Sequence, residues 1–206
     1  MLKSATKALR FVLPSQEIRK LVSNKAITSK QSLETGQIQP SSIDLRLSSK
    51  AWRMRASFLP GKNRTVKTWI DELAMQEINL SNGYILEKGS VYLVQLQEYL
   101  KLPHNIEVLA NAKSSTGRLD LFTRLIADYG TEFDTVNSGY SGPLYAEIAP
   151  NSFSVFAKKG IMLNQIRFKI LHNFEPKNLN LTNNIESADE HRASGANPSQ
   201  NFSINL

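Results

Sequence analysis

The feature that most constrains the fold of this chain is a series of short apolar runs of period two, separated by glycine-containing turns. The strongest strand patterns are Val91–Leu96 and Ile161–Ile170, and in Ile43–Leu47 aliphatic and polar residues alternate. Turn signals stand at Ser81–Gly83, Lys88–Gly89, Ser138–Gly139, Ser141–Gly142 and Lys159–Gly160. Short strands at this spacing favour an antiparallel sandwich or barrel over a parallel sheet with crossover helices.

Two short helices complete the expected secondary structure. Pro14 and Ser15 precede an acidic residue, and Ile18, Leu21 and Val22 recur at helical spacing, which predicts a helix beginning near Ser15. A second short helix is expected at Thr68–Met75. We therefore predict a mainly β fold with a short N-terminal helix.

The length of 206 residues indicates one domain with a tail. We predict an N-terminal extension at residues 1–12, a domain at 13–175 and a polar tail at 176–206, with Phe202–Leu206 as a last short strand. No run of 18 apolar residues exists, so no membrane span is expected. The chain has no cysteine, which excludes disulfides and thiolate metal sites and fits a reducing, cytoplasmic location.

Positive charge is concentrated in the first third of the chain. Residues 1–70 hold 14 Lys/Arg and 3 Asp/Glu, a net charge of +11, while the whole chain carries +7 and the remainder therefore −4. This excess indicates either an anionic partner, such as a nucleotide or nucleic acid, or a solvated basic face. Trp52 and Trp69 flank the basic cluster at residues 53–67, the pattern that a nucleic-acid-binding domain would need.

The segment Lys113–Arg118 (KSSTGR) combines two cations, three hydroxyls and a glycine. A polyphosphate needs such a mixture, because lysine supplies charge, arginine a bidentate fork and serine short donors. The segment is not a Walker loop. The alternative is an ordinary exposed turn.

A second motif, Gly139–Ile148, is a glycine-bounded turn that leads into a strand. Leu144, Ala146 and Ile148 share one face of that strand, and Tyr145 and Glu147 share the other. If the second face is enclosed, Glu147 is a candidate general base. If it is open, Glu147 is a solvated strand residue.

A third motif is Gln39–Leu47 (QPSSIDLRL), in which Asp44 and Arg46 lie on one face of the strand. These two residues could take part in catalysis, or they could form a structural ion pair with each other.

Zinc-dependent nucleobase deaminases use H-x-E and P-C-x-x-C motifs. This chain has no cysteine, and its three histidines are scattered, so we expect no zinc site.

Taken in chain order, the motifs are Gln39–Leu47, Lys113–Arg118, Gly139–Ile148 and Lys159–Ile166. Together they resemble the dCTP deaminase family, relatives of the trimeric dUTPases. The resemblance spans roughly residues 12–170. It implies a distorted antiparallel β-barrel of the dUTPase-like, β-clip type, and a homotrimer with active sites shared between subunits.

The resemblance also implies roles for particular residues. Ser114, Ser115 and Arg118, helped by Lys113, would hold the triphosphate with its Mg²⁺. Glu147 would deprotonate a water that attacks carbon 4 of cytosine, and would then carry the proton to the departing amine. Gln165 matches a glutamine near the nucleotide, and Asp44, Arg46 and Tyr140 are expected close to the site.

The sequence departs from the family pattern at several places. Asn137 stands where relatives carry an aspartate that activates water in dUTPases, which argues against dUTPase activity. Arg118–Arg124 and Gly142–Glu147 look most like the first half of a longer, duplicated form of the enzyme. The C-terminal lid is not recognisable in residues 188–206, and base-reading residues in 119–137 cannot be assigned.

The leading hypothesis is a zinc-independent deaminase that converts dCTP to dUTP and ammonia, with no membrane or nucleic-acid partner. The alternatives are a catalytically silent nucleotide-binding or scaffold relative, a dUTPase, and a basic nucleic-acid-binding domain.

Overall fold

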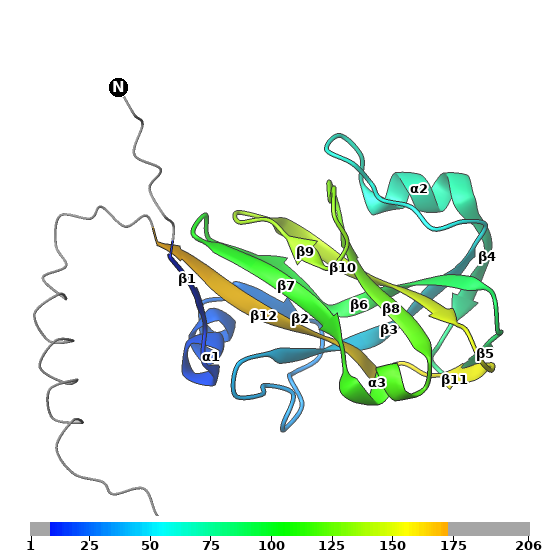
Figure 1. Cartoon of the computed structure of the whole chain (residues 1–206), viewed down its shortest axis with the longest axis horizontal. Helices are drawn as coiled ribbons and strands as arrows, with labels where there is room; N and C mark the ends of the chain where they lie inside the picture. Colours follow the sequence, from blue (N-terminus) through cyan, green and yellow to red (C-terminus); the bar gives the residue numbers. More distant parts are fainter. Residues whose placement is uncertain (1–8, 173–206) are drawn as a thin grey trace, which may run out of the picture. The chain divides into compact units, whose positions relative to one another are not determined.

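The computed structural model describes residues 9–172 and consists mainly of strands (Figure 1). In chain order the elements are β1 (Leu9–Val12), α1 (Ser15–Ser23), β2 (Ile27–Ser29), β3 (Ile43–Met54), α2 (Val66–Leu73), β4 (Ala74–Asn79), β5 (Tyr84–Leu86), β6 (Val91–Lys101), β7 (Ile106–Ala112), α3 (Ser114–Arg118), β8 (Leu121–Ala127), β9 (Thr135–Val136), β10 (Ser141–Pro150), β11 (Val155–Ala157) and β12 (Met162–His172).

Ten of the strands form one antiparallel sheet with the main order β8-β10-β6-β3-β12-β7-β9. β1, β2 and β4 add to β12, β6 and β3, and β5 and β11 form a separate two-stranded sheet. The long strand β3 pairs with β12 through Ile43–Arg46 and with β6 through Leu47–Met54, with a register shift between Leu47 and Ala51. This change of partner curves the sheet, which confirms the expected mainly β, barrel-like fold.

Backbone hydrogen bonds of Asp134 link β7 to β8 and so nearly close the sheet into a barrel. The backbone carbonyl of Asp134 accepts a hydrogen bond from the N–H of Ala110 in β7, and its backbone N–H donates to the carbonyl of Leu125 in β8. The Asp134 carboxylate also accepts from the Leu125 N–H at 2.8 Å. The residue has φ of 59°, a left-handed conformation that aspartate tolerates better than most residues. One turn residue thus joins the two ends of the main sheet.

The inner face of the barrel is the main core. It includes Leu144, Ala146 and Ile148, which the alternation in β10 predicted to share a face, and Ile43 and Leu45 of β3; all are fully buried. Full burial of one such large aliphatic side chain stabilises a fold by roughly 1.5–3 kcal/mol. The period-two pattern therefore sets which residues face inward.

The outer face of β6, β8 and β10 is covered at one end by α2 (Figure 1). Val66 and Ile70 of α2 belong to a second apolar cluster that contains Leu93, Ile126 and Tyr145 of the sheet. The Thr65 hydroxyl caps the helix by accepting from the Thr68 N–H, so α2 begins slightly before the expected Thr68–Met75.

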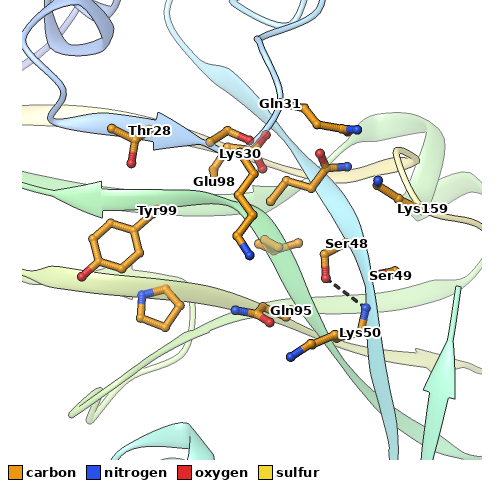
Figure 2. A pocket seen from close by; sticks show the side chains of 14 residues that line it. Thr28, Lys30, Gln31, Ser48, Ser49, Lys50, Gln95, Glu98, Tyr99 and Lys159 are labelled. Atoms are coloured by element: carbon orange, nitrogen blue, oxygen red, sulfur yellow. Dashed lines mark hydrogen bonds between the residues drawn. The ribbon is translucent and has the colours of Figure 1, made fainter. Parts of the chain in front are cut away.

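The other end of this outer face is open. It forms a cleft lined by residues of β2, β3 and β6 and by the turn after β11 (Figure 2). The outer face therefore offers two environments, one covered and apolar and one open and polar.

The N-terminal helix is confirmed as α1, which begins at Ser15. β1 pairs with β12, so the sheet includes Leu9–Val12, part of the segment assigned from the sequence to an extension. The expected final strand Phe202–Leu206 and the whole of the polar tail at 176–206 lie outside the described residues. No helix in residues 9–172 is long and apolar enough to cross a membrane.

Candidate active site

Glu147 lies in the middle of β10, on its outer face, and only 2% of its surface is exposed. In the sheet register it stands between Leu93 of β6 and Arg124 of β8. Arg124 donates to Glu147 Oε1 through Nε at 3.1 Å and through Nη2 at 2.5 Å. No hydrogen bond within residues 9–172 involves Oε2 of Glu147, so one oxygen is fixed by arginine and the other can bind a water.

Arg124 is itself held in place from several sides. Its Nη2 donates to Ser57 Oγ at 2.8 Å, and its guanidinium lies 3.5 Å from the ring centroid of Phe133 and 4.8 Å from that of Phe122. Cation–π contacts of this kind orient a guanidinium and partly replace its hydration. The Arg124 side chain is 24% exposed and that of Glu147 only 3%, so the arginine forms the solvent-facing side of the pair.

Two further carboxylates on this side of the sheet have raised pKa values, and one of them, Asp134, interacts with the pair. Burial raises the pKa of Asp134, the negative charge of Glu147 raises it further, and the Leu125 N–H and Arg124 oppose the shift. Burial also raises the pKa of Asp128, whose Oδ1 accepts from the Val66 N–H at 2.7 Å. Asp134 is thus a second carboxylate whose charge interacts with Glu147, and Arg124 offsets both charges.

Tyr140 and Tyr145 complete this end of the sheet. The Tyr140 hydroxyl donates to the carbonyl of Pro143 at 2.6 Å, and burial raises the pKa of this tyrosine. Burial, with the nearby charge of Asp128, raises the pKa of Tyr145 to about 12. Asn137 is exposed and lines a cavity of about 200 Å³ with Tyr140 and Asp128. The structure therefore places Asn137 and Tyr140 at the turn that leads into the Glu147 strand.

The segment Lys113–Arg118 forms the short helix α3, with Lys113 at its N-cap. Ser114, Ser115 and Arg118 are exposed there, which leaves their side chains available to a ligand. Thr116 is buried and donates from its hydroxyl to the Leu163 carbonyl at 3.0 Å. The segment is therefore anchored on β12 at one residue and open at the residues that the resemblance assigned to the triphosphate.

Lys113, Asp44 and Gln165 gather beside α3. Lys113 forms an ion pair with Asp44, which is buried in β3. Gln165 of β12 is the register partner of Asp44, and its Oε1 accepts from the Ser42 hydroxyl at 3.0 Å. Strand pairing between β3 and β12 therefore brings together the motifs Gln39–Leu47, Lys113–Arg118 and Lys159–Ile166.

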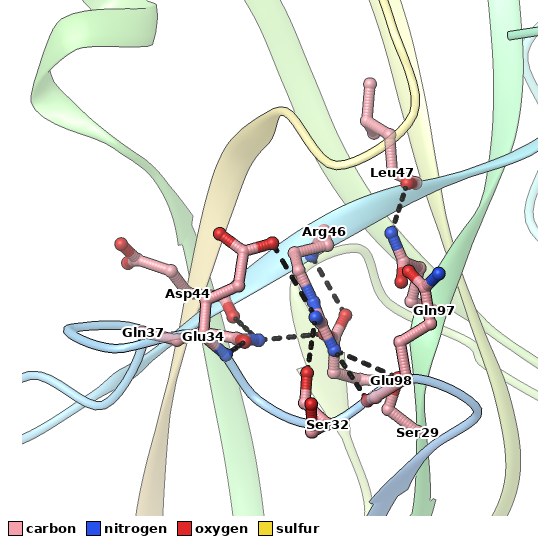
Figure 3. Close-up of polar contacts among 10 residues, drawn as sticks. Ser29, Ser32, Glu34, Gln37, Asp44, Arg46, Leu47, Gln97 and Glu98 are labelled. Carbon is pink, nitrogen blue, oxygen red and sulfur yellow. Dashed lines mark hydrogen bonds and ion pairs between the residues drawn. The ribbon is translucent and has the colours of Figure 1, made fainter. Parts of the chain in front are cut away.

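The possible ion pair between Asp44 and Arg46 is not formed. Arg46 instead donates from Nε to Glu98 of β6 at 2.8 Å (Figure 3). Asp44 pairs with Lys113. Both residues are buried in β3, and each is neutralised by an opposite charge from a different element. The other Arg46 donors reach Ser29 Oγ and the carbonyls of Gln31 and Ser32, so Arg46 has a structural role.

The predicted residues thus form two groups. One contains Glu147 with Arg124, and the other contains Lys113–Arg118 with Asp44 and Gln165. No hydrogen bond or ion pair between described residues joins them. Among the same residues, no three His, Asp or Glu side chains gather in an arrangement that could hold a metal ion.

Arg124, Ser57 and Phe133 are site residues that motif reasoning did not assign. Arg124 could have been found only from the pairing of its strand, β8, with the strand that carries Glu147, β10. That register depends on the turn at residues 128–140, which the sequence does not fix. Ser57 lies in a loop 90 positions from Glu147, and no local pattern connects the two.

Comparison with known proteins gives the family. The family model described as "2'-deoxycytidine 5'-triphosphate deaminase (DCD) N-terminal domain" matches residues 10–172. The chain belongs to the dCTP deaminase family. A curated relative from Coprothermobacter proteolyticus, named "dCTP deaminase, dUMP-forming", is 30% identical over 168 residues, which cover 78% of this chain and 83% of the relative. A relative of the same name from Nanoarchaeum equitans is 31% identical over 151 residues, with 67% and 73% covered.

A solved structure supports the same assignment. The crystal structure of 2'-deoxycytidine 5'-triphosphate deaminase from Agrobacterium tumefaciens matches with a TM-score of 0.76 and 46% sequence identity. The match covers 78% of this chain and 49% of that chain, so this dCTP deaminase family member spans about half the length of the solved protein. The resemblance inferred from the motifs is confirmed. The dUTP product is not, since the two curated relatives are named as dUMP-forming.

Proposed function

We propose that this chain hydrolytically deaminates dCTP, with Glu147 as the general base. The observation that carries the proposal is the buried Glu147 carboxylate, whose Oε1 is fixed by Arg124 while Oε2 has no hydrogen bond within residues 9–172. Oε2 takes a proton from a water as its oxygen forms a bond to carbon 4 of cytosine. The same carboxyl then gives the proton to the amino nitrogen, the C–N bond breaks and ammonia leaves. Activation of water by the carboxylate needs no zinc.

Arg124 has a positioning role in this scheme. Its contact with Oε1 holds the carboxylate in one orientation, with Oε2 left to accept a proton. Its packing against Phe133 and its bond to Ser57 keep the guanidinium from turning away. The proposal therefore assigns proton transfer to Glu147 and orientation to Arg124.

Ser114, Ser115 and Arg118 are proposed to bind the triphosphate, with Lys113 adding charge. Hydroxyl and guanidinium donors suit phosphate oxygens, so we propose that Mg²⁺ is held by the triphosphate itself. The ion pair of Lys113 with Asp44 and the anchoring of Thr116 on β12 support a preformed segment. Gln165, which lies beside this segment, is proposed to contact the nucleotide.

The separation of the two groups supports a shared site. Within residues 9–172 no hydrogen bond or ion pair joins the Glu147 group to the α3 group, yet one dCTP must meet both. We propose a homotrimer in which α3 of one copy faces Glu147 of another, because cyclic symmetry repeats such a pairing three times. Light scattering with nucleotide should give about three times 23.1 kDa. A mass near 23.1 kDa would contradict the shared site.

The product is proposed to be dUTP. Asn137 is exposed at the turn before β10, where an amide cannot take the proton of a water that attacks a phosphate. The relatives named as dUMP-forming make dUMP the alternative product.

A second function, nucleotide binding without turnover, is favoured by one observation. Leu93, Ile126 and Tyr145, the neighbours of Glu147 on the outer face, are packed against α2 in an apolar cluster. A base that approaches Glu147 must enter beside this covered region.

The test is incubation of the purified chain with dCTP and Mg²⁺, with ammonia and the nucleotide product both measured. The proposal predicts equal amounts of ammonia and dUTP, with the rate unchanged by a zinc-selective chelator. Equal ammonia and dUMP would keep the deamination and overturn the product. Binding of dCTP without ammonia would establish the silent relative.

A further inference from the structure

A cleft lies on the open end of the outer face, and its lining includes no residue of α3 and neither Glu147 nor Arg124. It has a volume of about 480 Å³, within the range of pockets that hold small molecules. Its floor is β6, where Gln95, Gln97 and Tyr99 point to the same side as Leu93, since side chains alternate along a strand. Leu93 pairs with Glu147 and Gln95 pairs with Tyr145, so the cleft begins one alternate position from the proposed base.

Three lysines line this cleft, and none of them is paired with a carboxylate of the described residues. Lys30, Lys50 and Lys159 come from three separate segments, and within residues 9–172 none of them forms an ion pair. The one carboxylate in the lining, Glu98, is buried and paired with Arg46. The net charge that faces the cleft is therefore positive, and its natural occupant is an anion.

Neutral donors accompany the lysines. Ser48, Ser49 and Thr28 offer hydroxyls, and Gln95 offers an amide. The side chains of Lys30, Lys50 and Gln95 point into the cleft (Figure 2). Short neutral donors around flexible ammonium groups suit the oxygens of phosphate groups, which accept several hydrogen bonds.

One wall of the cleft is held rigidly. Arg46 donates to the hydroxyl of Ser29 and to the carbonyls of Gln31 and Ser32, which flank Lys30 (Figure 3). Arg46 is only 1% exposed and is tied to Glu98 by its Nε and its backbone N–H. The segment that carries Lys30 is therefore fixed from below, so less conformational entropy is lost when an anion binds.

Tyr99 adds an aromatic surface. Its side chain lines the cleft, and the residue is 41% exposed, whereas core aromatic residues such as Tyr92 and Phe168 are fully buried. An exposed ring next to phosphate-binding groups is suited to stacking with a nucleobase.

We infer that this cleft is a second anion-binding site, separate from the α3 group, and that it binds the phosphates of a free nucleotide with its base against Tyr99. The site accounts for part of the basic excess in residues 1–70, because Lys30 and Lys50 belong to that region. It does not depend on deamination, since none of its lining residues takes part in the proposed reaction.

The test is calorimetric titration of the full chain with tripolyphosphate, in the wild type and in the triple variant Lys30→Gln, Lys50→Gln, Lys159→Gln. Exposed ion contacts are worth about 0.2–1 kcal/mol each, so each single change should weaken binding about 1.5–5-fold and the triple change roughly 3–100-fold. Arg118→Ala should remove only the other site, leaving the cleft occupied. Lys67→Gln, an exposed lysine of α2, is the matched control and should bind as the wild type does.

Tripolyphosphate affinity equal to the wild type in the triple variant would overturn the inference. A change in the mass of the assembly with no change in affinity would also overturn it, by showing that the lysines contact a neighbouring copy. Tyr99→Ala should weaken dCTP binding in the Arg118→Ala background and leave tripolyphosphate binding unchanged. Equal loss for both ligands would contradict the stacking role. Absence of turnover would refute the proposed function and leave these binding results unaffected.

Discussion

The guanidinium of Arg124 on β8 lies directly against the buried carboxylate of Glu147 on β10, with Nε 3.1 Å from Oε1. The two residues are opposite each other in the antiparallel register, so the sheet itself brings them together. The pair combines a buried carboxylate with a partly exposed guanidinium. We therefore expect substitution of Arg124 and substitution of Glu147 to have different effects.

Arg124→Gln should destabilise the chain, because it leaves a buried carboxylate without its partner. Breaking a fully buried pair costs about 3–5 kcal/mol, and since Arg124 is partly exposed we expect roughly 2–4 kcal/mol less free energy of unfolding. Urea unfolding at fixed protein concentration measures it. Arg53→Gln, which breaks the more exposed pair with Glu87, is the control and should cost about 1 kcal/mol or less. Equal losses for the two variants would show that the Glu147 pair is not buried in solution.

Glu98→Gln tests the network under the cleft. It removes the nearest anionic partner of the buried Arg46 guanidinium and leaves only the exposed Glu34 at 3.7 Å, so the free energy of unfolding should fall by about 3–5 kcal/mol. The double variant Arg46→Met, Glu98→Leu removes both charges and should lose less than Glu98→Leu alone. Lys20→Gln, which breaks the exposed pair with Glu17, is the surface control. A double variant less stable than the single one would show that the ion pair is itself a net stabilising interaction.

The fold could be predicted from the sequence wherever one strand face is buried. The alternation of Leu144, Ala146 and Ile148 marked the inner face of β10, and the motifs marked α3 and its neighbours. The partners of charged residues could not be predicted in the same way. Asp44 and Arg46 are two positions apart in one strand, but their partners come from α3's flank and from β6, and only the sheet order decides this.

Arg124 shows the same limit for the active site. Its approach to Glu147 depends on the register of β8 against β10, which the intervening turn sets. The alternation of Leu121, Thr123 and Leu125 keeps Arg124 on the outer face, but it does not fix which residue of β10 lies opposite Arg124.

Asp128→Asn should stabilise the chain at neutral pH. Burial, opposed by the Val66 N–H, raises the pKa of Asp128 above 3.8 in the folded state. The folded state then binds the proton more tightly than the unfolded state, so this group lowers stability as the pH rises through its folded pKa. Asparagine keeps the acceptor for Val66 without the charge. The gain over wild type should be largest at pH 7 and should shrink toward pH 3.8, as urea midpoints across this range will show.

Asp120→Asn is the opposite control for this pH effect. Hydrogen bonds from Ser152 and Asn151 lower the pKa of Asp120, so its contribution is present above 3.8 and is lost as the pH falls through its folded pKa. This variant should therefore lose stability at neutral pH. If both variants change in the same direction, the difference between the two environments is not the cause.

Arg118→Ala should weaken dCTP binding while leaving the fold intact. The side chain is exposed on α3, and a charge-assisted contact with phosphate is worth about 1.5–3 kcal/mol, which corresponds to roughly 10–100-fold in affinity. Titration with dCTP in the triple lysine background isolates this site from the cleft. Lys88→Gln, an exposed lysine in the turn before β6, serves as the control for loss of one charge. Unchanged affinity in Arg118→Ala would remove α3 from the substrate site.

The central claim is that Glu147 activates the attacking water, and Glu147→Gln tests it most directly. Glutamine keeps the size of the side chain and an oxygen that can accept from Arg124, and it cannot act as the base. Ammonia release from dCTP should fall by roughly 10²–10⁴-fold, the usual contribution of general acid–base catalysis, while dCTP affinity measured by calorimetry changes little. Full ammonia release by Glu147→Gln, with dCTP bound as in the wild type, would contradict the account.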